Sequence, residues 1–333
     1  MNGITVSIIT DLICLSIDNA GLSEISLPDN PALQELSLTD NRFSEFDLAR
    51  YPDLRMLSLS GNQFESLDLS GLNSLQTAAV GRNPMSRLTL DNPQLWGLSA
   101  ESCRLTMLDL SKVPIMSQLY LSENLFQSID LSSLAQLQAL DISQNAFTFP
   151  TLPLRNANWA IYYSANQALL APELSDSNQV DLSYNSPAAD GTPTVYEWYV
   201  GYPTYDDEGN IITVPFDEDA YTVEDGVTTF VEGGTDLVCY MTNPAFENIV
   251  MYTEPLRVSA VDSVVSEADI SVSAGEGSVT VRCLSEIEVT LYAFDGTAAG
   301  RSVVRNGSAR FDGLAQGVYI LVTPAGSYKL HVK

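Results

Sequence analysis

Apolar residues recur with a fixed spacing through the first half of the chain. Residues 33–41 and 54–62 both read L-x-x-L-x-L-x-x-N, and their asparagines, Asn41 and Asn62, are 21 positions apart. The frame runs back to Ala20, and its polar position is then occupied by Asn83, Cys103, Asn124, Asn145, Asn166 and, weakly, Asn185. A period this short and regular predicts a stack of small, similar units.

The L-x-L core of each unit predicts a short strand, with leucines pointing into the stack and the residues between them facing solvent on a concave side. One unit is too small to bury its own leucines, so neighbours must stack to form a core. The asparagine follows a turn whose backbone groups lack strand partners, and its side-chain amide can hydrogen-bond them. Because Cys103 occupies this position, we expect a buried structural residue rather than a reactive thiol.

This spacing is the signature of a leucine-rich repeat. From about residue 10 to residue 186, the chain resembles the short leucine-rich repeats of bacterial surface proteins, including the internalin-like and Bacteroidetes surface families. The resemblance implies a solenoid with short parallel strands and few helices over residues 1–186. It implies little about activity, because function resides in sites carried by a fold.

The leucine frame stops at a turn-rich segment, residues 186–193. Beyond it, runs of aromatic and β-branched residues separated by Gly, Pro and Asp predict a small β-sandwich over residues 187–262. Trp198 and Cys239 resemble the core Trp and second Cys of an immunoglobulin-like domain. The first Cys of that pair is absent, so no disulfide is implied.

A second break, at residues 259–269, precedes another domain that we expect to be a β-sandwich over residues 263–333. Residues 289–296, 314–321 and 328–333 resemble, in order, three parts of the type A sorting domain read by the type IX secretion system of Bacteroidetes: a strand with its turn, a G-x-Y strand and a basic terminal strand. The resemblance implies the secretion machinery as a partner. The Asn-Pro common near the start of such domains is missing, which leaves a β-sandwich without an export role as the alternative.

Net charge narrows the range of partners. The chain has a net charge of −27 and only three lysines. This argues against binding to nucleic acid or to anionic membrane surfaces, which both require basic patches. No apolar run is long enough to span a bilayer, so we expect no membrane insertion. Met1-Asn2-Gly3 lacks the positive start of a signal peptide, so an exported protein would need a leader that this sequence does not contain.

The four cysteines do not favour disulfides. Cys14 and Cys103 lie four repeats apart, roughly 19 Å at ~4.8 Å per strand, whereas a disulfide needs Cα atoms within ~7 Å. Cys239 and Cys283 fall in different predicted domains. We therefore expect free, buried thiols.

Acidic residues suggest two structural roles. Asp47, Asp68, Asp109 and Asp130 recur in one repeat position and should form a column on the convex side. Such a column could bind Ca²⁺, but we expect each Asp to cap a local turn. The clusters at 206–210 and 217–219 lack calcium-loop spacing and are expected to be solvated turns.

Catalytic chemistry has little support in the sequence. The one histidine, His331, lies near the chain end in an expected strand, which disfavours a Ser-His-Asp triad or a histidine metal site. No motif calls for a cofactor. Paired carboxylates could still hydrolyse a glycoside, although no pair is singled out by its spacing.

One patch stands out on the expected concave face. The middle column of outward residues is mostly hydroxylic and reads Ser16, Ser37, Ser58, Ala79, Ser99, Tyr120, Asp141, Tyr162 and Asp181. Tyr120, Asp141 and Tyr162 are neighbours in it, with Glu101 and Gln118 beside them. Aromatic rings flanked by acids can bind a sugar or anchor a protein partner, or simply stabilise the sheet by cross-strand contact.

These observations favour a non-catalytic exported or cell-surface protein whose concave face binds a protein or a glycan. The alternative is an architectural surface or stalk protein without a specific ligand. A carbohydrate-active enzyme is a remote third possibility.

Overall fold

A computed structural model describes residues 3–5, 12–27, 32–205, 208, 211–259, 270–275, 277–283, 286–293, 296–305, 307–324 and 326–333. Two hydrophobic cores hold these residues. The first runs through the repeats and continues into the sheets that follow, and the second belongs to the C-terminal residues.

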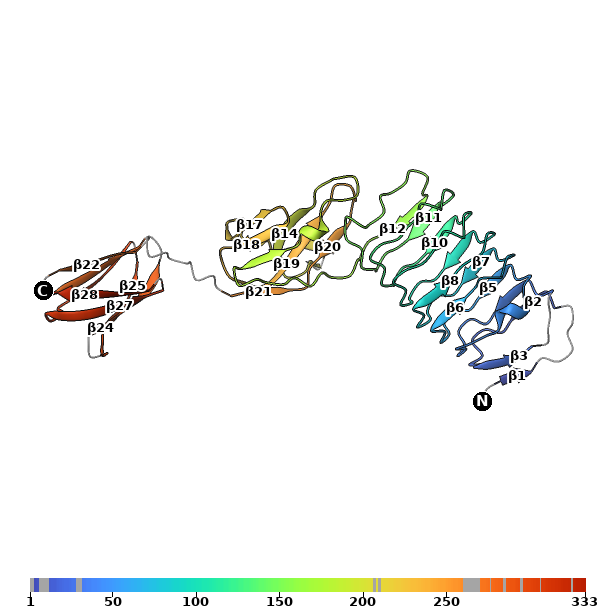
Figure 1. The fold of residues 1–333 in the computed structure, drawn as a ribbon, viewed down its shortest axis with the longest axis horizontal. Helices are drawn as coiled ribbons and strands as arrows, with labels where there is room; N and C mark the ends of the chain where they lie inside the picture. The colour runs from blue at the N-terminus through green and yellow to red at the C-terminus, as the bar shows by residue number, and fades with distance from the viewer. Residues whose placement is uncertain are drawn as a thin grey trace.

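The repeats form a β-solenoid, as the leucine spacing predicts. Within the described residues, one strand from each repeat joins a parallel sheet of eight strands (Figure 1). These strands are β2 (Cys14–Ser16), β4 (Glu35–Ser37), β5 (Met56–Ser58), β7 (Thr77–Ala79), β9 (Gly97–Ser99), β10 (Gln118–Tyr120), β11 (Ala139–Asp141) and β12 (Ile161–Tyr163).

The central residue of each strand builds the core. Leu36 pairs in register with Leu57, and both are buried. Further along the sheet, Leu119 pairs with Leu140, and neither is exposed. Because consecutive side chains in a strand alternate, the flanking residues face the concave side.

The asparagine at the end of each unit ties adjacent turns together. Asn62 Nδ2 donates to the carbonyl of Leu38 in the preceding turn and to that of Leu59 in its own, both at 2.9 Å. Its Oδ1 accepts the N–H of Phe43 at 3.0 Å. The side chain is buried, so these bonds satisfy backbone groups that no water reaches.

Cys103 takes the ladder position with weaker bonds, as predicted, but it is half-buried and not buried. Its Sγ lies 3.9 Å from the carbonyl oxygen of Val80 and 3.5 Å from that of Glu101. Burial raises the pKa of this thiol, which disfavours the reactive thiolate. All four cysteines are free, but only Cys239 and Cys283 are buried. Contrary to the expectation, Cys103 is half-buried and Cys14 is exposed, because the strand position of Cys14 faces the concave side.

The last turn departs from the predicted frame by one residue. Gln167, rather than Asn166, occupies the ladder position: its Oε1 accepts the N–H of Phe147 and its Nε2 donates to Ile142 and Ser164. Asn166 instead has a φ of 56°, as Gln144 (53°) has one turn earlier. The repeat that ends here is therefore one residue longer, and every outward position after Asp141 shifts by one.

The other side of the solenoid is less regular. There β3 (Glu24–Ser26) pairs with β1 (Gly3–Thr5), and β6 (Ser66–Asp68) pairs with β8 (Arg87–Thr89). Between β3 and β6 the chain forms the short helix η1 (Leu48–Arg50) instead of a strand. Among the described residues this side is therefore assembled from short pairs, not one continuous sheet.

The repeat ends against a group of antiparallel strands. Here β13 (Gln179–Asp181) joins a sheet in the order β13-β18-β17, so the prediction that Asp181 extends the concave column is wrong. A second sheet has the order β14-β19-β20, with β21 also on β19. The strands are β14 (Val195–Val200), β17 (Tyr221–Glu224), β18 (Val227–Phe230), β19 (Gly234–Thr242), β20 (Val250–Tyr252) and β21 (Leu256–Val258), and the short elements are η2 (Ser183–Asn185) and η3 (Glu218–Ala220).

Trp198 forms the centre of these sheets, where the sequence places it. It is buried, packs edge-on against Phe230 at 4.9 Å between ring centroids, and donates its Nε1–H to Thr228 Oγ1 at 3.0 Å. The acidic turn predicted at 206–210 lies largely outside the described residues. It falls between β15 (Thr204–Tyr205) and β16 (Ile211–Ile212), which pair antiparallel.

The C-terminal residues form two further antiparallel sheets, in the orders β22-β23-β26 and β25-β24-β27-β28. Their buried side chains make the second core. The break predicted at 259–269 lies almost wholly outside the described residues. The strands are β22 (Ser271–Gly275), β23 (Ser278–Arg282), β24 (Ile287–Ala293), β25 (Ala298–Val304), β26 (Ser308–Asp312), β27 (Gly317–Thr323) and β28 (Gly326–Val332). C-terminal β-sheet domains are thus present, while their β-sandwich type and the boundaries at 186 and 262 stay predictions.

Candidate functional site

The concave patch predicted from the sequence gathers on three neighbouring strands. Tyr120 on β10 pairs in register with Ser99 on one side and Asp141 on the other. Gln118, two residues earlier, lies between Gly97 and Ala139. Because these neighbours are small or short, Tyr120 and Gln118 rise above the rest of the surface.

Two carboxylates beside Tyr120 are held in place by hydrogen bonds. Glu101 Oε2 accepts the hydroxyl of Ser99. Its carboxyl lies over Gly81, where an added Cβ would come within 2.7 Å of Glu101 Cδ. Asp141 Oδ1 accepts the N–H and the hydroxyl of Ser143, at 3.0 and 2.6 Å. Both acids are therefore oriented before any ligand arrives.

Tyr162 does not join this patch, contrary to the prediction. The one-residue shift of the last turn places Tyr162 opposite the buried Leu140 and places Tyr163 opposite Asp141. Tyr162 packs on Trp159 with ring centroids 5.2 Å apart, and its hydroxyl donates to the carbonyl of Pro153. Burial raises the pKa of Tyr162 to about 12.

Tyr163 is the concave residue that the sequence frame missed. Its side chain is 59% exposed and continues the column of Tyr120 and Asp141. A signal for the shift is present in the sequence, because Trp159 and Gln167 also fit the repeat spacing with Tyr162 as the inward residue. The aromatic and acidic character of the predicted patch is thus retained, with Tyr163 in place of Tyr162.

The strand side of the solenoid is acidic. In the eight stretches from the residue before each strand to the turn that follows, the carboxylates are Asp18, Glu35, Asp40, Glu101, Glu123 and Asp141. The same stretches carry two cations, Arg55 and Arg82. Arg82 Nη2 lies 3.1 Å from Asp40 Oδ1, which offsets its charge. The face therefore presents a negative potential to any partner.

A cleft adjoins the patch where the solenoid meets the loop between β19 and β20. Its volume is about 520 Å³, and Ser143 and Tyr163 lie at the edge shared with the concave face. Opposite them, residues 244–249 form the second wall. Sequence periodicity could not reveal this cleft, because its two walls lie far apart along the chain.

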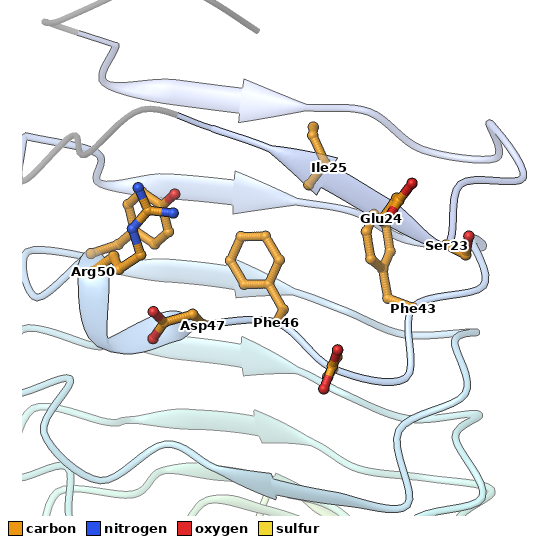
Figure 2. A pocket seen from close by; sticks show the side chains of 9 residues that line it. Ser23, Glu24, Ile25, Phe43, Phe46, Asp47 and Arg50 are labelled. Atoms are coloured by element: carbon orange, nitrogen blue, oxygen red, sulfur yellow. The ribbon is translucent and has the colours of Figure 1, made fainter. Parts of the chain in front are cut away.

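A second hollow of about 440 Å³ lies between the turn of β3 and the segment leading into η1. Figure 2 shows Phe46 in it, between Phe43 and Arg50. Phe46 stacks on Tyr51 with centroids 5.8 Å apart, and Arg50 Nη2 donates to the carbonyl of Leu27 at 3.1 Å. These contacts hold the walls of the hollow, which lies where the two turns are not joined by strand pairing.

The convex aspartates mostly cap turns, as expected. Asp68, Asp109 and Asp130 each accept the N–H of the serine two residues on, at 2.9 Å. Asp47 precedes η1 without a side-chain cap, so the expectation fails there. Among the described residues, no three His, Cys, Asp or Glu side chains gather as a metal ion would require.

No helix in the described part of the chain combines the length and apolarity needed to cross a membrane.

Comparison with known proteins returned structural matches only. No protein-family model matches the chain, and no curated protein matches it. The functional domain of InlJ from Listeria monocytogenes is 20% identical over 68% of this chain and 53% of its own, with a TM-score of 0.44. The leucine-rich effector YopM from Yersinia pestis is 20% identical over 48% of this chain and 50% of its own, with a TM-score of 0.38.

The leucine-rich repeat domain of APL1B is likewise 20% identical, over 47% of this chain and 48% of its own, with a TM-score of 0.37. The chain spans about half the length of each of these three structures. Identities this low do not bear on what the chain binds.

Proposed function

We propose that this protein is a non-catalytic, exported or cell-surface binding protein whose concave face recognises a protein or glycan ligand. The observation that carries the proposal is the column of half-buried Tyr120, half-buried Asp141 and exposed Tyr163 on the concave sheet, flanked by Glu101 and Gln118. Large side chains on an otherwise small, hydroxylic surface supply most of the contact area available to a partner.

Charge favours a protein partner with a basic surface for the middle of this face. Six carboxylates against two arginines in the strand stretches attract cations at long range and speed association at low salt. Glu101 and Asp141 are already oriented by serine hydrogen bonds, so binding does not have to order them.

Binding to an array of extracellular matrix proteins and glycans tests this proposal. We expect the double variant Tyr120→Ala, Asp141→Asn to lose at least about tenfold in affinity for a retained ligand, with an unchanged melting temperature. Tyr184→Ala is a matched control, because Tyr184 is 52% exposed on η2, outside the concave sheet. If no ligand on the array binds, the alternative of an architectural surface or stalk protein is favoured instead.

Export is proposed to depend on the C-terminal sheets, acting as a type A sorting domain read by a type IX secretion machinery of a Bacteroidetes host. Two features support this: these residues form a core separate from the first, and β27 and β28 pair as a hairpin that carries the G-x-Y segment and the basic end. Deleting residues 263–333 should trap the protein in the periplasm. Unchanged surface delivery would exclude this role and leave a plain β-sandwich.

A further inference from the structure

The cleft at the end of the concave face has polar walls from two distant parts of the chain. Arg155, Tyr163 and Asn166 line it from the last turn of the solenoid. Glu247 and Asn248 line it from the loop between β19 and β20. At about 520 Å³ it falls in the size range of sites that hold small ligands.

The two walls are fixed to each other. Phe149 of the solenoid stacks on Phe246 of the loop, with ring centroids 5.6 Å apart and planes 25° from parallel. The loop is also held at its start, where Asn243 Nδ2 donates to the carbonyl of Thr192 at 2.9 Å. A cleft formed before binding costs little ordering entropy when a ligand enters.

The large apolar side chains that line the cleft from the loop are already buried in the core. Phe246 and Ile249 are only 5% and 8% exposed, so they offer no deep pocket to an aliphatic or aromatic anchor from a partner protein. Tyr163, in contrast, presents 59% of its side chain. The accessible surface therefore combines the exposed ring of Tyr163 with polar groups and the small apolar side chains of Ala165 and Pro244.

Those polar groups are planar and carry both donors and acceptors. Arg155 supplies a fork of N–H donors, Glu247 supplies acceptors, and the amides of Asn166 and Asn248 supply both. Adjacent hydroxyls of a sugar, each able to donate and accept, match such a set, while the C–H face of a pyranose ring matches the face of Tyr163.

We propose that this cleft binds the end of an oligosaccharide, with one sugar ring against Tyr163 and its hydroxyls bonded by Arg155, Asn166, Glu247 and Asn248. The inference rests on the proposed binding function, and it assigns a glycan to the end of the column at Tyr163, two strands away from Tyr120. A protein partner on the acidic middle of the face and a glycan at its end could then be bound together.

A glycan array of bacterial and animal surface oligosaccharides, probed with the full chain, tests the inference. The retained oligosaccharide is then titrated calorimetrically into the protein. We expect Tyr163→Ala and Asn248→Ala each to weaken binding at least about tenfold, and Tyr163→Phe to retain it, because the ring and not the hydroxyl forms the platform.

Controls separate this site from the concave patch. Tyr120→Ala should leave glycan affinity unchanged, and an unaltered melting temperature of Tyr163→Ala would show that the exposed residue was not needed for folding. The inference is overturned if the array retains no oligosaccharide, if Tyr163→Ala binds as the parent does, or if only Tyr120→Ala loses the glycan. Loss of a protein ligand in the Tyr120 and Asp141 variant, with no glycan bound, would uphold the proposed function and reject this site alone.

Discussion

The two faces of the solenoid come from the same repeat but are built with different regularity. On the concave face, eight strands pair without interruption within the described residues, and a buried side chain ties each turn to the next. On the other face, strand pairs such as β6 and β8 alternate with segments held by serine–aspartate caps. Strand pairing is therefore continuous on the face that has the buried amide ladder. On the face held by exposed caps, the local structure varies from turn to turn.

The largest expected difference between the faces is in stability. Asn62→Ala removes the buried partner of the Phe43 N–H and one of the two asparagine donors to each of the carbonyls of Leu38 and Leu59, so we expect a loss of about 3 kcal/mol in the free energy of unfolding. Asp68→Ala, the matched change on the other face, removes one exposed cap and should cost much less. Urea denaturation followed by circular dichroism measures both, and equal losses would contradict the comparison.

Alkaline pH probes the inner side of the concave sheet. The folded protein holds the pKa of Tyr162 at about 12, above its usual 10, so its stabilising contribution is full below pH 10 and is lost between pH 10 and 12. We expect Tyr162→Phe to reduce the fall in unfolding free energy over this window. It should also cost about 1 kcal/mol at neutral pH through the lost bond to Pro153.

Tyr196→Phe is a useful companion, because burial raises the pKa of Tyr196 to about 12 as well. Each variant should reduce the fall in unfolding free energy between pH 10 and pH 12. If Tyr162→Phe leaves this fall unchanged, Tyr162 faces solvent and the shifted register of the last turn is wrong.

Restoring the ladder should strengthen the concave face. In Cys103→Asn, the new amide can donate to the carbonyls of Val80 and Glu101, to which the Cys103 thiol makes only weak S–H contacts. We expect the free energy of unfolding to rise by about 1 kcal/mol, read as a higher melting temperature. Cys103→Ala serves as the control and should lower it; a decrease in both variants would show that the site is too tight for an amide.

The smallest effect should come from acid on the convex caps. Hydrogen bonds from the hydroxyl and N–H of Ser132 lower the pKa of Asp130 below its usual 3.8. The contribution of Asp130 to stability is therefore present above pH 3.8 and is lost as the pH falls through the pKa of the folded state. Asp130→Asn should remove a small part of the stability change between pH 4 and pH 2, measured by thermal unfolding. An increased acid sensitivity would contradict the cap.

The repeat spacing predicted most of the solenoid because it reflects a local constraint repeated many times. Leu36, Leu57 and Leu140 point inward as expected, since each sits at the centre of a three-residue strand. The same constraint fails where the sequence fits two registers. At the last turn, Asn166 and Gln167 both suit the ladder, and only the packing of neighbouring turns decides between them.

Contacts between residues far apart in the sequence determine the parts of the structure that the repeat spacing did not predict. The strand β13 has the alternation of a repeat strand, yet it pairs with β18 about fifty residues later along the chain, as the 50-residue separation of Gln179 and Thr229 shows. The cleft beside Tyr163 likewise depends on residues 244–249, which carry no repeat pattern. Of the candidate site, Tyr120, Gln118, Glu101 and Asp141 were therefore predictable, whereas Tyr163 and the cleft were not.

Asn185 links the end of the solenoid to the sheets that follow. Its Oδ1 accepts the N–H of Phe149 at 2.8 Å, while its Nδ2 lies 3.2 Å from the sulfur of Met241 and 3.8 Å from that of Met251. These methionines come 56 and 66 residues later. During synthesis, which proceeds from the N-terminus, the open end of the repeat stack must wait for them. The nascent solenoid therefore leaves Asn185 and Phe149 uncovered until Phe246 and β20 have left the ribosome.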